Sequence, residues 1–316
     1  MDQTRRYTAA AVQATPVFLD REATVAKAVR LIEELAAAGA RLIAFPEAFV
    51  AGYPYWLWGR DLDDEPSFEQ GAYSALWREA VDVPGPETKR LGEAARTTGS
   101  CVIIGVNERE SAFGRGTLFN TLLTFAPDGR LIGRRRKLVP TYRERTVWGQ
   151  GDGSTMAVQE TTFGRIGALI CWENFMPLAR YHQYAQGEQI HVAATADDSP
   201  AWQALTTAIA AEGRVYVVSV CSYFSTAQFP GHPMLRGFDA DDVIHHGRSR
   251  IVAPGGETLA GPLEDQEGVV TAEIDLDRVI EEKHSLDVAG HYARPDVFRL
   301  AVNEEPALPY RSPTAD

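Results

Sequence analysis

A cysteine that directly follows an apolar segment is the first candidate for chemistry in this chain. Cys171 comes after residues 166–170, a run typical of a buried strand, and a helix pattern begins a few residues later. A thiol at a strand-to-helix turn projects from the end of a sheet, where backbone N–H groups can lower its pKa and bind a developing anion. Cys171 is therefore a candidate nucleophile. Cysteines are more often small buried hydrophobes, and Cys101 and Cys221, inside apolar strands, take that simpler interpretation.

A glutamate and a lysine also follow expected strands, and a second glutamate lies close to the lysine. Glu47 comes directly after the apolar segment 41–45, and Lys137 follows another strand pattern, with Glu144 seven residues later. Taken singly, such residues are ordinarily surface or capping groups, but α/β sheets gather catalytic groups at their strand ends. The seven histidines, the usual source of a base for a thiol, show no acid partner in the sequence that would single one out. The carboxylates are therefore better placed than the histidines.

Strand and helix patterns alternate along the chain. Asp20 caps a helix whose apolar residues recur at helical spacing until Gly39, and residues 127–129 mark a hairpin. Apolar runs predict strands at residues 7–13, 41–45, 101–106, 118–125, 130–136, 165–170, 189–194, 215–221 and 269–274, and a late hairpin at 251–259. Helical spacing predicts further helices at residues 86–98, 176–186 and 201–212. This alternation predicts an α/β fold.

Two segments have no clean period, namely the aromatic-rich residues 53–77 and the Gly-, Pro- and Phe-rich residues 223–242. Long irregular loops in a compact domain often form lids or pocket walls, so we expect that role for them. Because no linker divides the chain, we predict a single domain over residues 1–300. The Pro-rich and polar residues 301–316 are expected to form an extended or disordered tail.

Composition limits the possible partners and location. The formal net charge of -12 argues against a nucleic-acid or anionic-membrane surface, since either needs clustered Lys and Arg. The longest apolar runs are too short to span a membrane. An odd count of three cysteines, with no apolar stretch near the first residue, predicts free thiols in a reducing cytoplasm.

Five motifs, in order along residues 7–300, resemble the nitrilase superfamily of carbon–nitrogen hydrolases. They are FPEAF at 45–49, RRKLVPT at 135–141, ERTVWGQGDG at 144–153, CWEN at 171–174 and GHYARPD at 290–296. Such a set is far more specific than a single cysteine motif. The resemblance implies a four-layer α-β-β-α sandwich of the nitrilase type. It also implies a catalytic triad of Glu47, Lys137 and Cys171, with Glu144 as the second glutamate of the family.

Within the superfamily, the chain is similar to true nitrilases. The residues that carry this likeness are Trp172 and Glu173 after the cysteine, together with the motifs at 148–151 and 291–292. Many relatives have histidine before the second glutamate, whereas this chain has Arg143, which can alter the packing or charge around that carboxylate.

The resemblance implies hydrolysis of an organic nitrile by two waters, giving a carboxylic acid and ammonia. A covalent thioimidate and then a thioester would form on Cys171. Glu47 would accept and return protons, Lys137 and the backbone N–H of Trp172 would stabilise the tetrahedral species, and Glu144 would hold the lysine. No cofactor and no metal ion are expected.

The aromatic segment 52–58, just past Glu47, predicts an apolar pocket suited to an organic nitrile. We expect Tyr53, Trp56 and Trp172 to bind substrate. A hydrophobic contact between subunits explains the tryptophans of that segment equally well, because aromatic residues are also enriched at interfaces. Members of the family commonly form dimers and spirals, so the resemblance also implies a homo-oligomer.

Three alternatives remain open at this stage. An enzyme of the same scaffold can stop at the amide, as nitrile or cyanide hydratases do, or can hydrolyse amides. The branch point is whether the tetrahedral adduct expels ammonia or the cysteine, a difference of about 1 to 3 kcal/mol between competing barriers. A catalytically silent oligomeric scaffold is the alternative from a different class, and the intact triad argues against it.

Overall fold

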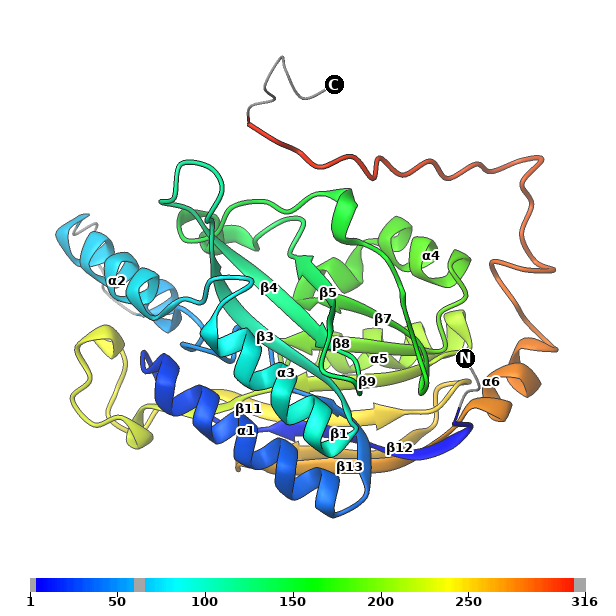
Figure 1. Ribbon diagram of the computed structural model, residues 1–316, viewed down its shortest axis with the longest axis horizontal. Coiled ribbons are helices and arrows are strands. Elements are labelled where there is room, and N and C mark those ends of the chain that lie inside the picture. Colours follow the sequence, from blue (N-terminus) through cyan, green and yellow to red (C-terminus); the bar gives the residue numbers. More distant parts are fainter. Residues whose placement is uncertain (1–3, 60–65, 310–316) are drawn as a thin grey trace.

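Two mixed β-sheets face each other in the computed structural model, which describes residues 4–59 and 66–309 (Figure 1). The first sheet has the order β13 (Gly268–Asp275), β1 (Arg6–Gln13), β2 (Ala40–Ala44), β3 (Cys101–Arg109), β4 (Leu118–Phe125) and β5 (Leu131–Arg136). The second has the order β10 (Tyr223–Ser225), β11 (Val243–Val252), β9 (Tyr216–Cys221), β8 (Ile190–Thr195), β7 (Gly164–Ile170) and β6 (Gln159–Thr161), with β12 (Thr258–Glu264) paired to β11.

The apolar side chains of the central strands alternate between two cores. On β1, Ala9 and Ala11 enter the core between the sheets, whereas Ala10 and Val12 point to the outer face of the first sheet. Successive strand residues point to opposite faces, and both faces of these strands are covered. The near-continuous apolar runs in the sequence follow from this double burial.

Helices cover the outer face of each sheet. α1 (Arg21–Ala37) and α3 (Pro86–Thr98) lie side by side on the first sheet, and α4 (Pro177–Ala185) and α5 (Pro200–Gly213) pack on the second (Figure 1). Asp20 caps α1, since its side chain accepts a hydrogen bond from the backbone N–H of Ala23 at 2.9 Å. The predicted four-layer α-β-β-α sandwich is confirmed. No helix in residues 4–59 and 66–309 is both long and apolar enough to cross a membrane.

Several local predictions were wrong. Within the segment expected to be irregular, α2 (Pro66–Glu79) is a regular helix that buries Ala72 and Leu76 at a spacing of four residues. The prediction missed this narrow stripe because exposed polar residues surround it. α6 (Leu276–Lys283) was also missed; it directly follows β13 and is capped by Asp275. β11 begins at residue 243 rather than 251, because its first residues alternate between exposed and buried positions.

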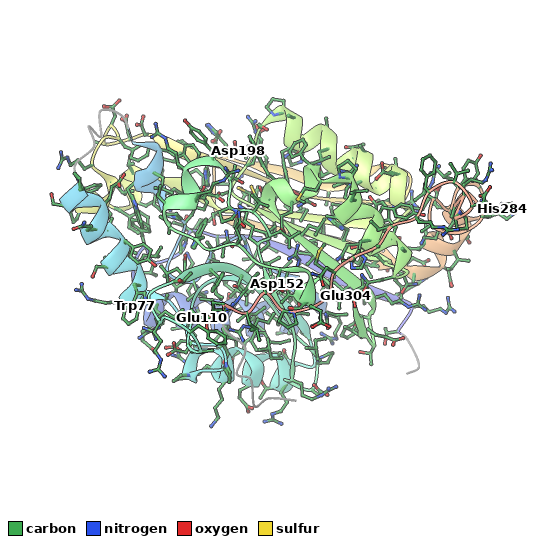
Figure 2. All side chains as sticks on the ribbon, turned by 90° about the horizontal axis from the view of Figure 1, so that it is seen from above. Trp77, Glu110, Asp152, Asp198, His284 and Glu304 are labelled. Atoms are coloured by element: carbon green, nitrogen blue, oxygen red, sulfur yellow. The ribbon has the colours of Figure 1, made fainter. Side chains whose placement is uncertain are left out.

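The chain after α6 runs along the outside of the sandwich. Residues 284–309 contain no helix or strand, and most of them are exposed (Figure 1). The backbone N–H of Ala307 donates to the carboxylate of Asp152 at 2.8 Å, and Figure 2 shows this segment, on which Glu304 is labelled, passing Asp152. The predicted tail lies in this segment as far as residue 309, and residues 310–316 fall outside the described residues.

Candidate active site

Three of the predicted residues come together at the strand ends of the two sheets. Glu47 follows β2 and Lys137 follows β5, both in the first sheet, while Cys171 follows β7 in the second. The three residues are 2%, 1% and 4% exposed. Their side chains therefore lie at the junction of the sheets and not on the surface, where residues of these types usually occur.

The backbone around Glu47 depends on a glycine in the neighbouring strand. A β-carbon on Gly105 of β3 would lie 2.2 Å from the carbonyl oxygen of Pro46, and the N–H of Gly105 donates to that oxygen at 3.2 Å. Oε1 of Glu47 accepts a hydrogen bond from Nδ2 of Asn120 at 2.7 Å. Oε2 has no hydrogen-bond partner among the described residues, so one carboxylate oxygen is free to take up a proton.

Lys137 lies between two buried carboxylates. Its Nζ is 2.7 Å from Oε1 of Glu47 and 2.7 Å from Oε2 of Glu144. Burial alone would lower the pKa of Lys137, but the negative charges of Glu47 and Glu144 raise it above its ordinary value, so the side chain remains an ammonium ion. Glu144 is held in turn by the hydroxyl of Tyr53, which donates to Oε1 at 2.7 Å.

Burial also changes the acidity of Glu47. It raises the pKa of this carboxyl above its ordinary value, and the charge of Glu144 acts in the same direction, while Lys137 opposes both. A carboxylate whose pKa is raised toward neutrality is a stronger proton acceptor than a solvated one. The site therefore contains a buried base with one unpaired oxygen.

The Cys171 thiol is protonated in this environment. Burial raises its pKa well above the ordinary value, and the charges of Glu47 and Glu144 raise it further, while Lys137 lowers it. The expectation of a lowered pKa was wrong, because burial of the thiol outweighs any effect of the backbone N–H groups at the turn. The hydroxyl of Thr195 donates to Sγ at 3.3 Å. Activation of this thiol requires a base.

Cys171 also has an unusual backbone conformation. Its φ angle is 50°, in the left-handed region that non-glycine residues seldom adopt. Such residues are held by the surrounding structure and cluster at functional sites. The turn Cys171–Phe175 that begins there is a short 3-10 helix leading into α4.

Glu173 connects the lysine and the cysteine, and the sequence did not predict this. Its Oε2 accepts from the backbone N–H of Ile170 at 2.8 Å, and its Oε1 accepts from the backbone N–H of Leu138 and from Nη2 of Arg135, the latter at 2.9 Å. One buried carboxylate thus ties the residue before Cys171 to the residue after Lys137. The only signal in the sequence is its position in the cysteine motif.

Two polar residues beside the site were also missed. Asn120 contacts Glu47 and Thr195 contacts Cys171, as described above. Asn120 interrupts the apolar run of β4, and Thr195 ends β8, the strand next to β7. A buried polar residue in a strand generally requires a hydrogen-bond partner, so these positions could have been found from that rule.

The predicted substrate-binding residues occupy different environments. Tyr53 and Trp56 are buried in an aromatic cluster that also contains Trp148 and Phe224, and Tyr53 reaches Glu144 from it. Trp56 is only 2% exposed, so it cannot itself form a subunit contact. Trp172 is 52% exposed, and its Nε1 donates to Oδ2 of Asp197 at 2.8 Å.

The two irregular segments meet in this aromatic cluster. Phe224 stacks on Tyr55 with ring centroids 3.7 Å apart, which joins residues 223–242 to residues 53–58.

Arg143, which stands where many relatives have histidine, donates from Nη1 to the carbonyl oxygen of Leu57 at 2.9 Å. Arg143 therefore anchors the aromatic segment and does not contact the carboxylate of its neighbour Glu144 among the described hydrogen bonds.

No group of three or more His, Cys, Asp or Glu side chains in the described ranges is arranged to hold a metal ion.

A family model described as carbon-nitrogen hydrolase matches residues 8–283. The chain belongs to the carbon-nitrogen hydrolase family. It falls in the nitrilase branch, because curated nitrilases match nearly the whole chain. One, from Bradyrhizobium diazoefficiens, is 44% identical over 97% of this chain and 95% of its own.

Two further comparisons describe the range of the family. A bifunctional nitrilase/nitrile hydratase of Lupinus angustifolius is 41% identical and covers 95% of this chain and 87% of its own length. The crystal structure of a carbon-nitrogen hydrolase superfamily protein from Xanthomonas campestris matches with a TM-score of 0.71 at 18% identity, over 95% of this chain and all of that one. This second likeness supports the fold alone.

Proposed function

We propose that the protein is a nitrilase that hydrolyses an organic nitrile to a carboxylic acid and ammonia, with Cys171 as nucleophile. The observation that carries the proposal is the buried array of Glu47, Lys137 and Glu144 beside a protonated thiol. Curated relatives at 41% to 44% identity are named nitrilases, which supports the same activity. We further propose that residues 1–300 act as one catalytic domain.

The first half of the reaction forms the covalent intermediate. Glu47 accepts the thiol proton through its free Oε2, and the thiolate of Cys171 attacks the nitrile carbon. A carbon–sulfur bond forms as the carbon–nitrogen triple bond becomes a double bond. Glu47 then returns the proton to nitrogen, which leaves a neutral thioimidate on the cysteine.

The second half consumes two waters. Glu47 removes a proton from the first water, which adds to the thioimidate carbon and gives a tetrahedral species. Glu47 passes the water proton to the nitrogen, and Lys137 and the backbone N–H of Trp172 stabilise the charge that develops on the tetrahedral species. The added hydroxyl gives up its proton, by way of Glu47, to the same nitrogen, so that ammonia leaves as the carbon–oxygen double bond of the thioester forms. A second water, activated in the same way, cleaves the resulting thioester and releases the carboxylic acid and the thiol. Glu144 keeps Lys137 charged and in place throughout.

We propose that Tyr53, Trp56 and Trp172 shape the substrate site. Tyr53 links the aromatic cluster to Glu144, and Trp56 supports it from within the cluster. Trp172 follows the nucleophile in the chain, and its large ring is half exposed. An aromatic wall favours an organic nitrile over a charged metabolite.

We also propose that the protein is a cytoplasmic homo-oligomer. Its three cysteines are unpaired and buried, which fits a reducing compartment. Apolar side chains are exposed on the turn after the nucleophile and on α4 and α6, including Phe175 at 42%, Leu178 at 68% and Ile280 at 60%. Contact with further subunits would cover such side chains.

The amide is the second candidate product, because the Lupinus angustifolius relative is named as bifunctional. Incubation with aliphatic, aromatic and arylaceto nitriles, followed by measurement of acid, amide and ammonia, separates the two. We expect acid and ammonia in equal amounts as the main products of at least one nitrile. Amide as the sole product would replace the proposal by a hydratase, and the absence of turnover on every nitrile, with turnover of amides, would replace it by an amidase.

The pH dependence of kcat/KM is expected to show the raised pKa of Glu47. The reaction needs Glu47 as a carboxylate, so activity is present above its pKa and is lost as the pH falls through it. Because burial raises this pKa, the acid limb should have its midpoint above the ordinary value of 4.5. Glu144→Gln removes a charge that raises the same pKa and should move the midpoint to lower pH while reducing the rate.

The control for this shift is Glu87→Gln, which removes a buried carboxylate from α3, where Glu87 pairs with Arg21 at 2.9 Å. Its acid limb should coincide with that of the wild type. A wild-type midpoint at or below 4.5, or an upward shift in Glu144→Gln, would show that Glu47 is not the group whose ionisation limits the reaction.

A further inference from the structure

A buried chain of polar side chains lies behind the nucleophile. Oε1 of Glu188 is 2.8 Å from Nδ1 of His191, whose Nε2 is 2.7 Å from Oδ1 of Asn174. Nδ2 of Asn174 donates to the carbonyl oxygens of Cys171 at 2.8 Å and of Leu169 at 3.1 Å. Glu188, His191 and Asn174 are each 0% exposed. The chain thus ends on the backbone on both sides of the strand-to-turn junction.

The hydrogen bonds fix which atoms carry protons. Because both amide hydrogens of Asn174 are donated to backbone carbonyls, its Oδ1 must accept, so Nε2 of His191 carries a hydrogen. Nδ1 then either donates to a Glu188 carboxylate, as part of an imidazolium ion, or accepts from a protonated Glu188. In both cases Glu188 sets the ring orientation and keeps the hydrogen on Nε2. The histidine prediction missed this pair because its partner lies three residues earlier, before β8.

A glycine on β7 leaves space for the buried carboxylate of Glu188. A β-carbon on Gly167 of β7 would lie 1.8 Å from Oε1 of Glu188 and 2.2 Å from Oε1 of Gln183. Glycine at this position lets the carboxylate approach the strand that leads to Cys171. His191, two residues into β8, pairs in register with Gly167. The ring therefore belongs to the sheet and not to the turn, and the acid, which precedes β8, packs against β7.

This attachment matters because the turn itself is in an uncommon conformation. Cys171 has a φ angle of 50°, and its carbonyl oxygen must face Asn174, a member of the same turn. A hydrogen bond within a turn can move with the turn. His191 connects Asn174 to the sheet. Through these contacts β8 helps to fix the position of the Cys171 backbone.

We propose that Glu188, His191 and Asn174 form a positioning relay that holds the Cys171 turn in its reactive conformation. The proposal rests on the proposed role of Cys171 as nucleophile. The three residues act through the backbone of Cys171 and not on the substrate. Misplacement of a nucleophile by about 1 Å can cost on the order of 100-fold in rate, so loss of the relay should reduce turnover without weakening substrate binding.

Three variants and a control test the relay. Glu188→Leu removes the partner of Nδ1. Glu188→Gln can donate an amide hydrogen to Nδ1 and so keeps the hydrogen on Nε2. Asn174→Asp keeps the shape and the acceptor for His191 but removes both N–H donors. Glu87→Leu removes a buried carboxylate that pairs with Arg21 on the outer helix layer, far from this chain of contacts.

Each variant is assayed for kcat and KM on a hydrolysed nitrile, for melting temperature, and for the rate of iodoacetamide alkylation of Cys171 measured by peptide mass. We expect Glu188→Leu and Asn174→Asp to lower kcat about 10- to 100-fold with KM within about threefold, and to change the alkylation rate of Cys171. Glu188→Gln should stay within about threefold of the wild type. Glu87→Leu should lower only the melting temperature.

A purely structural role predicts a different pattern. In that case both variants, Glu188→Leu and Asn174→Asp, would lower the melting temperature. The value of kcat, divided by the fraction of protein whose Cys171 can be alkylated, and the alkylation rate would stay at their wild-type values. That result would overturn the relay. Should Glu188→Leu fail to fold, the isosteric Asn174→Asp decides by the same criterion. If the wild type hydrolyses no nitrile, the proposed function fails, while the alkylation rates still test the relay.

Discussion

Replacing Cys171 with alanine will lower kcat for nitrile hydrolysis by at least about 10⁴-fold while the protein remains folded. In the proposed mechanism the sulfur of Cys171 bonds to the nitrile carbon, and loss of a covalent nucleophile removes most of the catalysis of the groups that act with it. The side chain is small, and its one described hydrogen bond is the 3.3 Å contact from Thr195, so the free energy of unfolding should change by only about 1 kcal/mol. Activity assays and urea unfolding measure the two effects.

Cys101→Ala is the matched control. Cys101 is a fully buried thiol on β3 in the core between the sheets, and its pKa is raised to about 12 by burial. Its replacement should lower the free energy of unfolding and leave kcat close to the wild-type value. Acid formation by Cys171→Ala at more than about 1% of the wild-type rate would exclude the covalent mechanism.

The second large effect is expected at Lys137. Lys137→Met leaves Glu47 and Glu144 buried together without the cation that now lies 2.7 Å from each. We expect the free energy of unfolding to fall by about 3 to 5 kcal/mol, since an uncompensated buried charge remains. We expect kcat to fall by about 10²- to 10³-fold, because the tetrahedral species loses its cationic stabiliser.

The double variant Lys137→Met with Glu144→Gln separates the two consequences. It removes one of the two carboxylates, so it should recover part of the lost stability. It should not recover kcat, since the lysine is still missing. Recovery of kcat together with stability would mean that Lys137 serves the fold alone, and a kcat of Lys137→Met near the wild-type value would mean the same.

The residues proposed to carry the chemistry were predictable because each follows a strand, apolar before Glu47 and Cys171 and basic before Lys137. Glu47, Lys137 and Cys171 occupy equivalent places in the chain, and strand ends of α/β sheets meet at an edge. Their pairing was not predictable from spacing alone, because Lys137 and Cys171 come from different sheets. The bridge that Glu173 forms between them exists only once the sheets have packed.

Other features depended on tertiary packing in the same way. The pKa of Cys171 is raised by burial and by two carboxylates that are far away in the sequence, so the local argument from a strand-to-helix turn gave the wrong sign. The helix α2 was missed because only Ala72 and Leu76 are buried in it. The capped helix α1, in contrast, was predicted from Asp20 and its apolar spacing, since both signals are local.

The most direct test is to locate the acyl group during turnover. Wild-type protein mixed with a hydrolysed nitrile is quenched in acid after less than one turnover, digested, and analysed by mass spectrometry. We predict that the peptide containing Cys171 gains the mass of the thioimidate or thioester, and that this thiol resists iodoacetamide while the adduct is present. An adduct on another side chain, or acid released while Cys171 stays fully alkylatable throughout, would contradict the mechanism.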